Sequence, residues 1–212
     1  MNIVLNNLEK YCYKLFYEDF EITKFEDWVY SNKELEDIMN KDDYIDLISL
    51  DFKSRHIKSE IEKVVEKYID YGKFEKKLIL TLLYRALKSK NDLPDILMKF
   101  YYMYCHGYIF FEDLGLGYGL TCEVPPSKYT ADTWYELNEE EKDEIIDTFY
   151  PKITVDIKRA IDWIENDKIV LLGTQNELEH WEFLDNRNVE EKKSNIWVEV
   201  SKDKKWWQFW NK

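Results

Sequence analysis

The sequence predicts a mainly α-helical fold, a helical, bundle-like single domain with a small β element near the C-terminus (α+β). Only 6 glycines and 4 prolines interrupt the 212 residues, which favours long regular elements over many turns. Apolar residues recur at helical spacing through most of 1–166, and from residue 168 the spacing changes to the alternation typical of strands. We therefore expect one domain over 1–212, with short strands at about 168–200 and a Trp-rich tail at 201–212.

Short helices are expected at the start of the chain. Leu8, Cys12 and Leu15 recur at near-helical spacing, and the stretches FEDWVY and KELEDIMN are typical of short helical pieces. The apolar positions of YIDLISLDF fit a buried helix better than a half-exposed strand, and Asp42 and Asp43 can cap it. The expected helices cover 3–17, 25–30, 33–40 and 44–52.

The two clearest helices lie at 56–70 and 74–89, where apolar residues mark one face of each segment. Gly72 lies between them and can end the first helix with a left-handed residue. Asp92 then caps a third helix, in which Pro94 costs little because it falls in the first turn.

The C-terminal half predicts two more helices and then strands. Asn138 and Glu141 have the spacing of a capping box, and Pro151 can open the helix that follows. After residue 168, three segments read as short strands because apolar residues alternate or run together over a few positions. These expected strands are KIVLLG (168–173), HWEFLD (180–185) and NIWVEVS (195–201).

The charge and the cysteines limit the class of protein. The 43 acidic and 30 basic residues give a net charge of −13, which repels nucleic acid backbones and attracts a basic protein partner. The 3 cysteines have no Cys-x-x-Cys spacing, which indicates a reducing compartment. The N-terminus is unlike a signal peptide and no window reaches 18 apolar residues, so we expect a cytoplasmic protein without a membrane span.

The glycine-rich stretch GLGYG raises the question of a nucleotide site. Gly115, Gly117 and Gly119 alternate as in loops that wrap phosphates. The context is wrong, however, because Pro125 follows closely where a helix should begin, and Asp113 and Glu123 would repel phosphate. We interpret the stretch as an irregular loop that lets large aromatic side chains pack closely.

Few residues of the sequence could support metal binding or catalysis. Cys105, His106, Cys122 and His180 could form a zinc site, although adjacent helical side chains point about 100° apart and the usual ligand spacing is missing. The same segment, 105–122, could hold an enzyme pocket with a cysteine nucleophile. We expect no cofactor and no metal, with Cys105 and Cys122 as small buried hydrophobic residues, and the enzyme or metal-site protein stays the alternative.

Acidic clusters and the C-terminal aromatic residues are the candidate partner-binding groups. Carboxylates are too abundant for any two to stand out as a catalytic pair, and we interpret them as solvated faces and helix N-terminal charges. WWQFW could contact a membrane interface, but docking on its own domain or a protein interface fits a short aromatic tail in an acidic chain better. The candidates are Glu34, Glu36, Asp37, Asp42, Asp43, Asp46, Glu139, Glu140, Trp206, Trp207 and Trp210.

Residues 25–75, from FEDWVY through YIDLISLDFKSRHIKSEIEKVV to YIDYGKFE, resemble small acidic immunity-type proteins of polymorphic toxin systems in low-GC Gram-positive bacteria (Firmicutes). The resemblance covers about a quarter of the chain and includes no catalytic motif. It implies a cytoplasmic inhibitor that binds a cognate toxin domain and performs no chemistry. The sequence therefore predicts a non-catalytic protein-binding protein with a basic partner, and a scaffold that self-associates through its Trp-rich tail is the second alternative.

Overall fold

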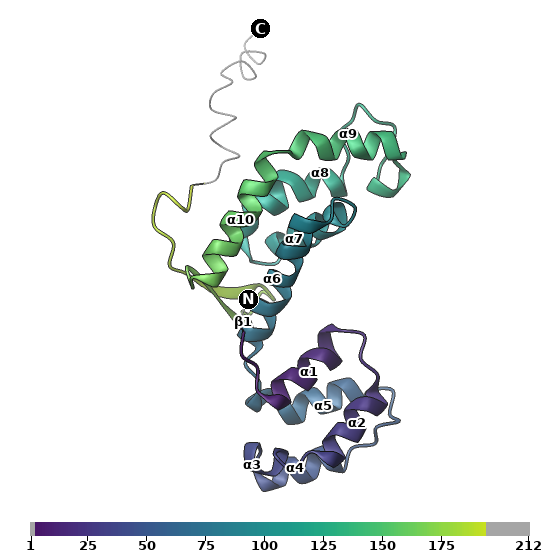
Figure 1. Ribbon diagram of the computed structural model, residues 1–212, viewed down its shortest axis with the longest axis vertical. Helices are drawn as coiled ribbons and strands as arrows, with labels where there is room; N and C mark the ends of the chain where they lie inside the picture. The colour runs from purple at the N-terminus through teal and green to yellow at the C-terminus, as the bar shows by residue number, and fades with distance from the viewer. Residues whose placement is uncertain (1–2, 194–212) are drawn as a thin grey trace. The chain divides into compact units, whose positions relative to one another are not determined.

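The computed structural model of the protein describes residues 3–193 (Figure 1). These residues contain ten α-helices and one two-stranded antiparallel sheet, which confirms the predicted mainly α fold with a small β element towards the C-terminus. The chain divides into two compact units, Met1–Phe74 and Glu75–Lys212, and the boundary falls in the first turn of α6 (Tyr71–Lys88). The expectation of one domain over 1–212 stays a prediction.

The first unit is a set of short helices around one apolar core. Helix α1 begins at Asn7 because Asn6 and Glu9 form a capping box, in which each side chain accepts a hydrogen bond from the other residue's backbone N–H. Tyr11 stacks on Trp28 with ring centroids 4.2 Å apart and joins the first two helices. The helices are α1 (Asn7–Tyr17), α2 (Ile22–Ser31), α3 (Leu35–Ile38), α4 (Lys41–Ile48) and α5 (Ile57–Val65), followed by a 3-10 turn (Glu66–Tyr68). The fully buried core residues include Leu8, Cys12, Leu15, Phe25, Val29, Leu35, Leu47, Ile61, Val65 and Phe74.

Three boundaries in this region differ from the sequence-based expectation. Asn40 caps α4 through a hydrogen bond from the Asp43 backbone N–H, so Asp42 and Asp43 lie inside the first turn and do not cap it. The helix ends at Ile48, well before residue 52. Gly72 lies inside α6 and does not end the preceding helix, which tightens into the 3-10 turn instead.

The second unit contains the three longest helices of the described residues, α6, α7 and α10. Asn138 and Glu141 form the predicted capping box at the start of α9, and α10 begins directly after Pro151 as expected. Asp92 takes the predicted N-cap position of α7, but its carboxylate pairs with Arg85 Nε at 2.7 Å and not with the helix backbone. The elements after α6 are α7 (Leu93–Cys105), α8 (Leu120–Glu123), α9 (Glu139–Phe149) and α10 (Lys152–Glu165), with 3-10 turns at Ile109–Phe111 and Trp134–Glu136.

The glycine-rich stretch is helical, which corrects the expectation of an irregular loop. Glu112–Gly119 forms a π-helix that runs into α8 and packs along α7. A Cβ on Gly115 would lie 2.7 Å from the Phe100 carbonyl oxygen, and one on Gly119 would lie 2.3 Å from the Leu97 carbonyl oxygen. The glycines therefore permit two helix backbones to approach closely, so the interpretation of close packing holds in a different conformation.

A buried ionic group attaches the π-helix to α10. The Asp156 carboxylate is buried, accepts a hydrogen bond from the Tyr118 hydroxyl at 2.7 Å, and lies 2.7 Å from Arg159 Nη2. The same guanidinium nitrogen lies 2.6 Å from Asp113 on the π-helix. Because a buried carboxylate is stable only when it is paired and hydrogen-bonded, these contacts fix the register between the two elements.

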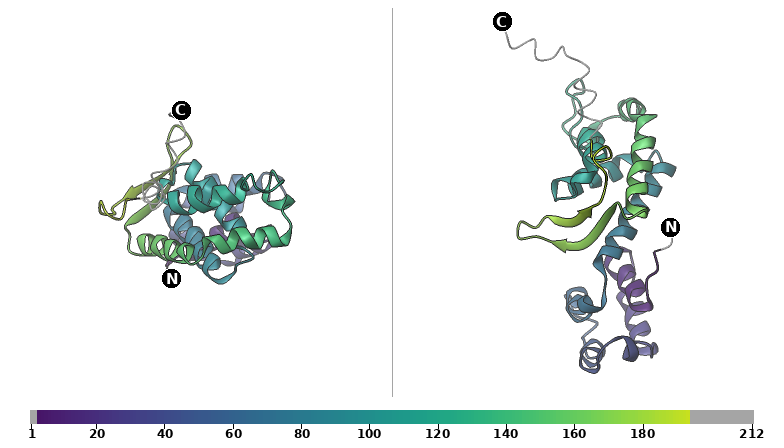
Figure 2. Two further views of the ribbon diagram at one scale, coloured as in Figure 1. Left: turned by 90° about the horizontal axis from the view of Figure 1, so that it is seen from above. Right: turned by 90° about the vertical axis from the view of Figure 1, so that its left-hand side faces the viewer.

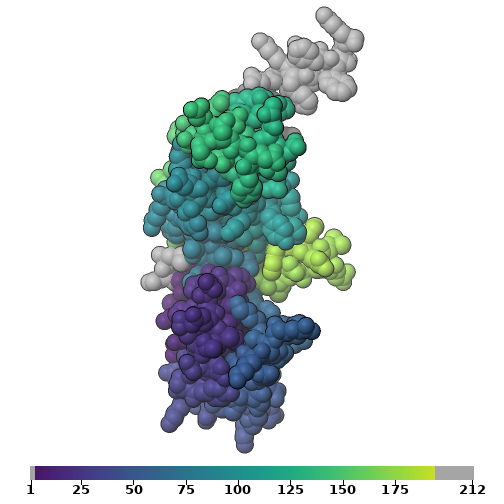
Figure 3. All heavy atoms as spheres, turned by 90° about the vertical axis from the view of Figure 1, so that its right-hand side faces the viewer, coloured from purple at the N-terminus to yellow at the C-terminus, as the bar shows by residue number. Residues whose placement is uncertain are grey.

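The two predicted strands that fall within residues 3–193 form a β-hairpin. Strands β1 (Ile169–Gln175) and β2 (Trp181–Asp185) pair antiparallel, with Leu171 opposite Phe183 and an irregularity between Leu171 and Gln175. The hairpin projects from the helices of its unit (Figures 2 and 3). It is attached at the end of α7, where the Trp181 backbone N–H donates to the His106 carbonyl at 2.8 Å and Phe183 packs on Phe110. The third expected strand, 195–201, lies outside the described residues.

Candidate functional site

Six of the candidate carboxylates lie on α3, at its N-cap residue Glu34, and on α4 (Figure 1). Asp42, Ile45 and Asp46 are exposed and lie three or four residues apart, so they share one face of α4. We call this surface, together with Tyr30 beside it, the α4 face. Ile45 is 45% exposed and Tyr30 is 58% exposed, and the Tyr30 hydroxyl donates to the Ile48 carbonyl oxygen at 3.0 Å. The α4 face therefore combines apolar side chains with carboxylates.

The carboxylates of α3 and α4 differ in whether a cation or a hydrogen-bond donor of the same chain lies beside them. Asp37, Asp42 and Asp46 have no lysine, arginine or histidine nitrogen within 4 Å among residues 3–193. Glu34 accepts a hydrogen bond from Asn7 Nδ2 at 2.5 Å and remains exposed. Partial burial and the nearby charge of Glu36 raise the pKa of Tyr44. Three of these carboxylates thus make no ion pair among residues 3–193, although the charge of Asp46 still acts on Lys67.

Asp43 is engaged within the chain, unlike its neighbours. Its carboxylate is 16% exposed, lies 2.5 Å from Lys67 Nζ, and accepts hydrogen bonds from the Tyr68 hydroxyl and Asn40 Nδ2. The bond to Lys67 is the main cause that lowers the pKa of Asp43 below its ordinary value, and the bond to Tyr68 adds to it. Asp43 therefore holds α4 to the end of the α5 region and offers little free charge to a partner.

The second acidic cluster, at the start of α9, is paired more fully. Glu139 lies 2.9 Å from Lys142, and Glu144 lies 2.6 Å from Lys128. Glu140 is exposed, and no cation lies within 4 Å of it in the described part of the chain. A basic partner would have to compete with internal lysines here, so this cluster is electrostatically weaker than the α4 face.

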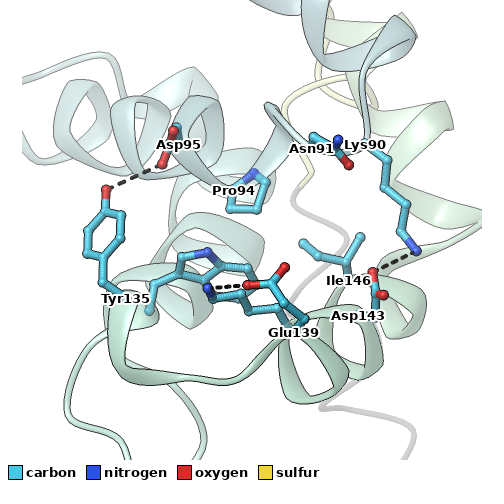
Figure 4. A pocket seen from close by; sticks show the side chains of 10 residues that line it. Lys90, Asn91, Pro94, Asp95, Tyr135, Glu139, Asp143 and Ile146 are labelled. Carbon is cyan, nitrogen blue, oxygen red and sulfur yellow. Dashed lines mark hydrogen bonds and ion pairs between the residues drawn. The ribbon is translucent and has the colours of Figure 1, made fainter.

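A pocket of about 250 Å³ opens between α7 and α9 (Figure 4). Asp95 and Tyr135 lie on one side of it and Lys90 and Asp143 on the other, with Pro94 between them. Tyr135 reaches Asp95 through a hydrogen bond of 3.3 Å from its hydroxyl, and Lys90 lies 3.4 Å from Asp143. We call this the α7–α9 pocket, and it is lined by Lys90, Asn91, Pro94, Asp95, Trp134, Tyr135, Glu139, Lys142, Asp143 and Ile146.

Sequence reasoning placed Glu139 near a binding surface but missed the rest of this pocket. The signal that could have indicated it is the pair Trp134-Tyr135, which stands directly before the Asn138 capping box. The approach of α7 to this pair is a long-range contact, and no local pattern encodes it.

The cysteines and histidines do not form the considered zinc site. Cys122 is fully buried, and burial, with a smaller contribution from Asp95, raises the pKa of its thiol to about 12. Cys105 is exposed, which corrects the expectation that it is buried. His106 stacks on Tyr102 with ring centroids 3.9 Å apart, and its Nδ1 lies 2.8 Å from the Tyr102 carbonyl oxygen. Residues 3–193 contain no group of three or more His, Cys, Asp or Glu side chains placed to hold a metal ion.

The remaining candidates lie outside the described residues. Trp206, Trp207 and Trp210 belong to 194–212, so the expected roles of the tail stay predictions. Within 3–193, none of the helices has both the length and the apolar character that crossing a membrane requires. Comparison of the chain with protein-family models, with curated proteins and with solved structures finds no match.

Proposed function

We propose that the chain is a non-catalytic protein-binding protein, and specifically an immunity-like inhibitor that captures a basic toxin domain. The observation that carries the proposal is the α4 face. There Ile45 and Tyr30 are exposed near Asp42 and Asp46, whose carboxylates have no lysine, arginine or histidine nitrogen within 4 Å among residues 3–193. Protein interfaces combine apolar and aromatic anchors at their centre with polar and charged groups around them, and this face has both components.

The unpaired carboxylates favour a basic partner over a neutral one. A lysine or arginine that approaches Asp42 or Asp46 gains an ion pair without breaking one inside the chain. The exposed carboxylates also create a negative potential that steers a basic protein before contact. The net charge of −13 acts in the same direction at longer range.

Two considerations support a toxin domain as the partner. Domains that act on nucleic acid need a positive surface to bind phosphates, and an acidic protein can cover that surface and block it. The segment that resembles immunity-type proteins, 25–75, contains α4 and most of α2. The resemblance and the α4 face therefore fall on the same part of the chain.

The test uses the C-terminal domain of the protein encoded next to this chain's gene. We expect that domain to be basic, to stop growth when expressed alone, and to permit growth when this chain is expressed with it. Association of the purified proteins should slow at least about tenfold between 50 and 500 mM NaCl, because salt screens exposed charges. If the two proteins neither associate nor restore growth, the proposed function is wrong.

Matched double variants assign the surface. Asp42→Asn with Asp46→Asn removes two unpaired charges from the α4 face and should slow association by about three- to tenfold. Glu144→Gln with Glu190→Gln removes the same charge from carboxylates that already pair with Lys128 and Lys193, and should have a smaller effect. Equal losses in both variants would show that net charge, and not the α4 face, guides capture.

A further inference from the structure

The α7–α9 pocket has an aromatic wall and a carboxylate, Asp95, whose cationic neighbour, Arg85, is engaged by Asp92. Trp134 is 6% exposed and lines the pocket, while Tyr135 beside it is 73% exposed. Asp95 accepts a hydrogen bond from the Tyr135 hydroxyl at 3.3 Å, and no lysine or arginine nitrogen lies within 4 Å of Asp95 among residues 3–193. Aromatic rings beside a carboxylate attract a cation through both charge and the ring quadrupole.

The lysines of the pocket do not cancel this negative charge. Lys90 lies 2.8 Å from Asp147 and 3.4 Å from Asp143, so two carboxylates surround one ammonium group. Lys142 is paired with Glu139 at 2.9 Å. Both ammonium groups are therefore engaged by carboxylates, and Lys90 lies on the side of the pocket opposite Asp95 and Tyr135 (Figure 4). A raised pKa of Tyr135, caused mainly by the charge of Asp95, is consistent with a negative potential beside these two residues.

We propose that the α7–α9 pocket binds one arginine side chain of the partner protein, with its guanidinium group between Asp95 and the rings of Trp134 and Tyr135. This inference rests on the proposed function, because it names what the basic partner presents. Arginine fits better than lysine because its planar guanidinium stacks on aromatic rings and pairs with a carboxylate through two N–H groups.

The dimensions and the exposed groups support a single side chain as the occupant. A volume of about 250 Å³ lies below the range of about 300–1,000 Å³ typical for drug-sized ligands. Pro94 and Ile146 supply apolar surface that the methylene groups of arginine can cover. The Tyr135 hydroxyl bonds to Oδ1 of Asp95, and the guanidinium can engage the other carboxylate oxygen, Oδ2.

The test uses small probes and needs no protein partner. The ¹⁵N-labelled full chain is titrated with N-acetyl-arginine methylamide, and the Trp134 indole and Tyr135 backbone N–H signals are followed by NMR. N-acetyl-citrulline methylamide has nearly the same shape without the charge and should bind at least about fivefold more weakly, as expected for loss of a cation–π and a carboxylate contact. Equal shifts with both probes, or no shift at these two residues, would overturn the inference.

A pair of variants separates the pocket from general acidity. Asp95→Asn should lower the affinity for the arginine probe about three- to fivefold, because it removes the exposed carboxylate that pairs with the guanidinium group. Glu177→Gln is the control, since Glu177 is an exposed carboxylate of the same unit that does not line the pocket, and it should leave the affinity unchanged. Spectra of both variants should otherwise match the wild type, and an equal loss in the control would contradict the proposal.

The pocket and the proposed function can fail separately. If the arginine probe binds at Trp134 but the neighbouring gene product is not captured, the pocket assignment stands and the proposed function is wrong. If the toxin domain is captured equally well by wild type and Asp95→Asn, the function stands and arginine binding in this pocket is wrong.

Discussion

Gly119 is a position where one added methyl group should strongly disturb the second unit. A Cβ at this residue would lie 2.3 Å from the Leu97 carbonyl oxygen and 2.9 Å from Tyr101 Cβ, whereas ordinary contacts begin near 3.4 Å. The obstacle is backbone and cannot rotate aside, so Gly119→Ala must separate the π-helix and α7 by about 1 Å.

The expected cost follows from two opposing effects. Overpacking a tight contact costs about 1–3 kcal/mol, and a backbone obstacle favours the upper end of that range. Alanine regains about 1 kcal/mol because glycine is a poor residue inside a helix. The free energy of unfolding should therefore fall by about 2 kcal/mol, which corresponds to a Tm lower by roughly 4–8 °C.

Gly117→Ala is the matched control in the same element. Gly117 is half-buried and lies two residues from both Gly115 and Gly119, so it points away from the side on which those two meet α7. We expect this variant to be as stable as the wild type or slightly more stable. Urea unfolding followed by far-UV circular dichroism measures all three proteins, and a Gly119→Ala protein within about 0.5 kcal/mol of the wild type would refute the packing argument.

Three other expectations concern the caps, the thiols and pH. Asn138→Ala removes the capping box of α9 and should lower the free energy of unfolding by about 1 kcal/mol in urea titrations, and no change would contradict the role of the cap. Only Cys105 should react rapidly with Ellman's reagent in the folded protein, because Cys12 and Cys122 are buried with raised thiol pKa values; more than one fast thiol would be inconsistent with this. The pKa of Asp43 is lowered in the folded state, so its contacts stabilise the fold above the pKa of the unfolded chain, and this stabilisation is lost as the pH falls. Between about pH 5 and pH 3, the urea midpoint of the wild type should therefore fall more than that of Asp43→Asn.

Local signals predicted the elements that depend on local physics. The Asn138–Glu141 capping box occurs as expected because both of its hydrogen bonds join residues three apart in the sequence. The helical stripes and the alternation in β1 and β2 likewise reflect which side chains face the core. For these elements, the presence of a helix or a strand was therefore accessible from the sequence.

The elements that sequence reasoning misjudged depend on distant contacts. Gly115 and Gly119 look like loop residues in isolation, yet they lie in a π-helix, where α7 packs against them and leaves no room for a side chain. Gly72 looks like a helix end, yet it continues α6, since the preceding turn already closes in 3-10 geometry. In both cases a glycine has more than one use, and the neighbouring element decides between them.

The carboxylates of the candidate site also depend on distant contacts. Asp42, Asp43 and Asp46 are equivalent in the sequence as acidic residues of one short segment. Lys67 and Tyr68, which lie more than twenty residues away, engage Asp43 and leave the other two exposed. A basic partner gains most from carboxylates that form no ion pair within the chain. The binding surface is therefore indicated by which carboxylates are unpaired, and not by how many acidic residues a segment contains. The same reasoning directs the search for contacts to Asp42, Asp46 and Asp95, and away from the paired carboxylates of α9.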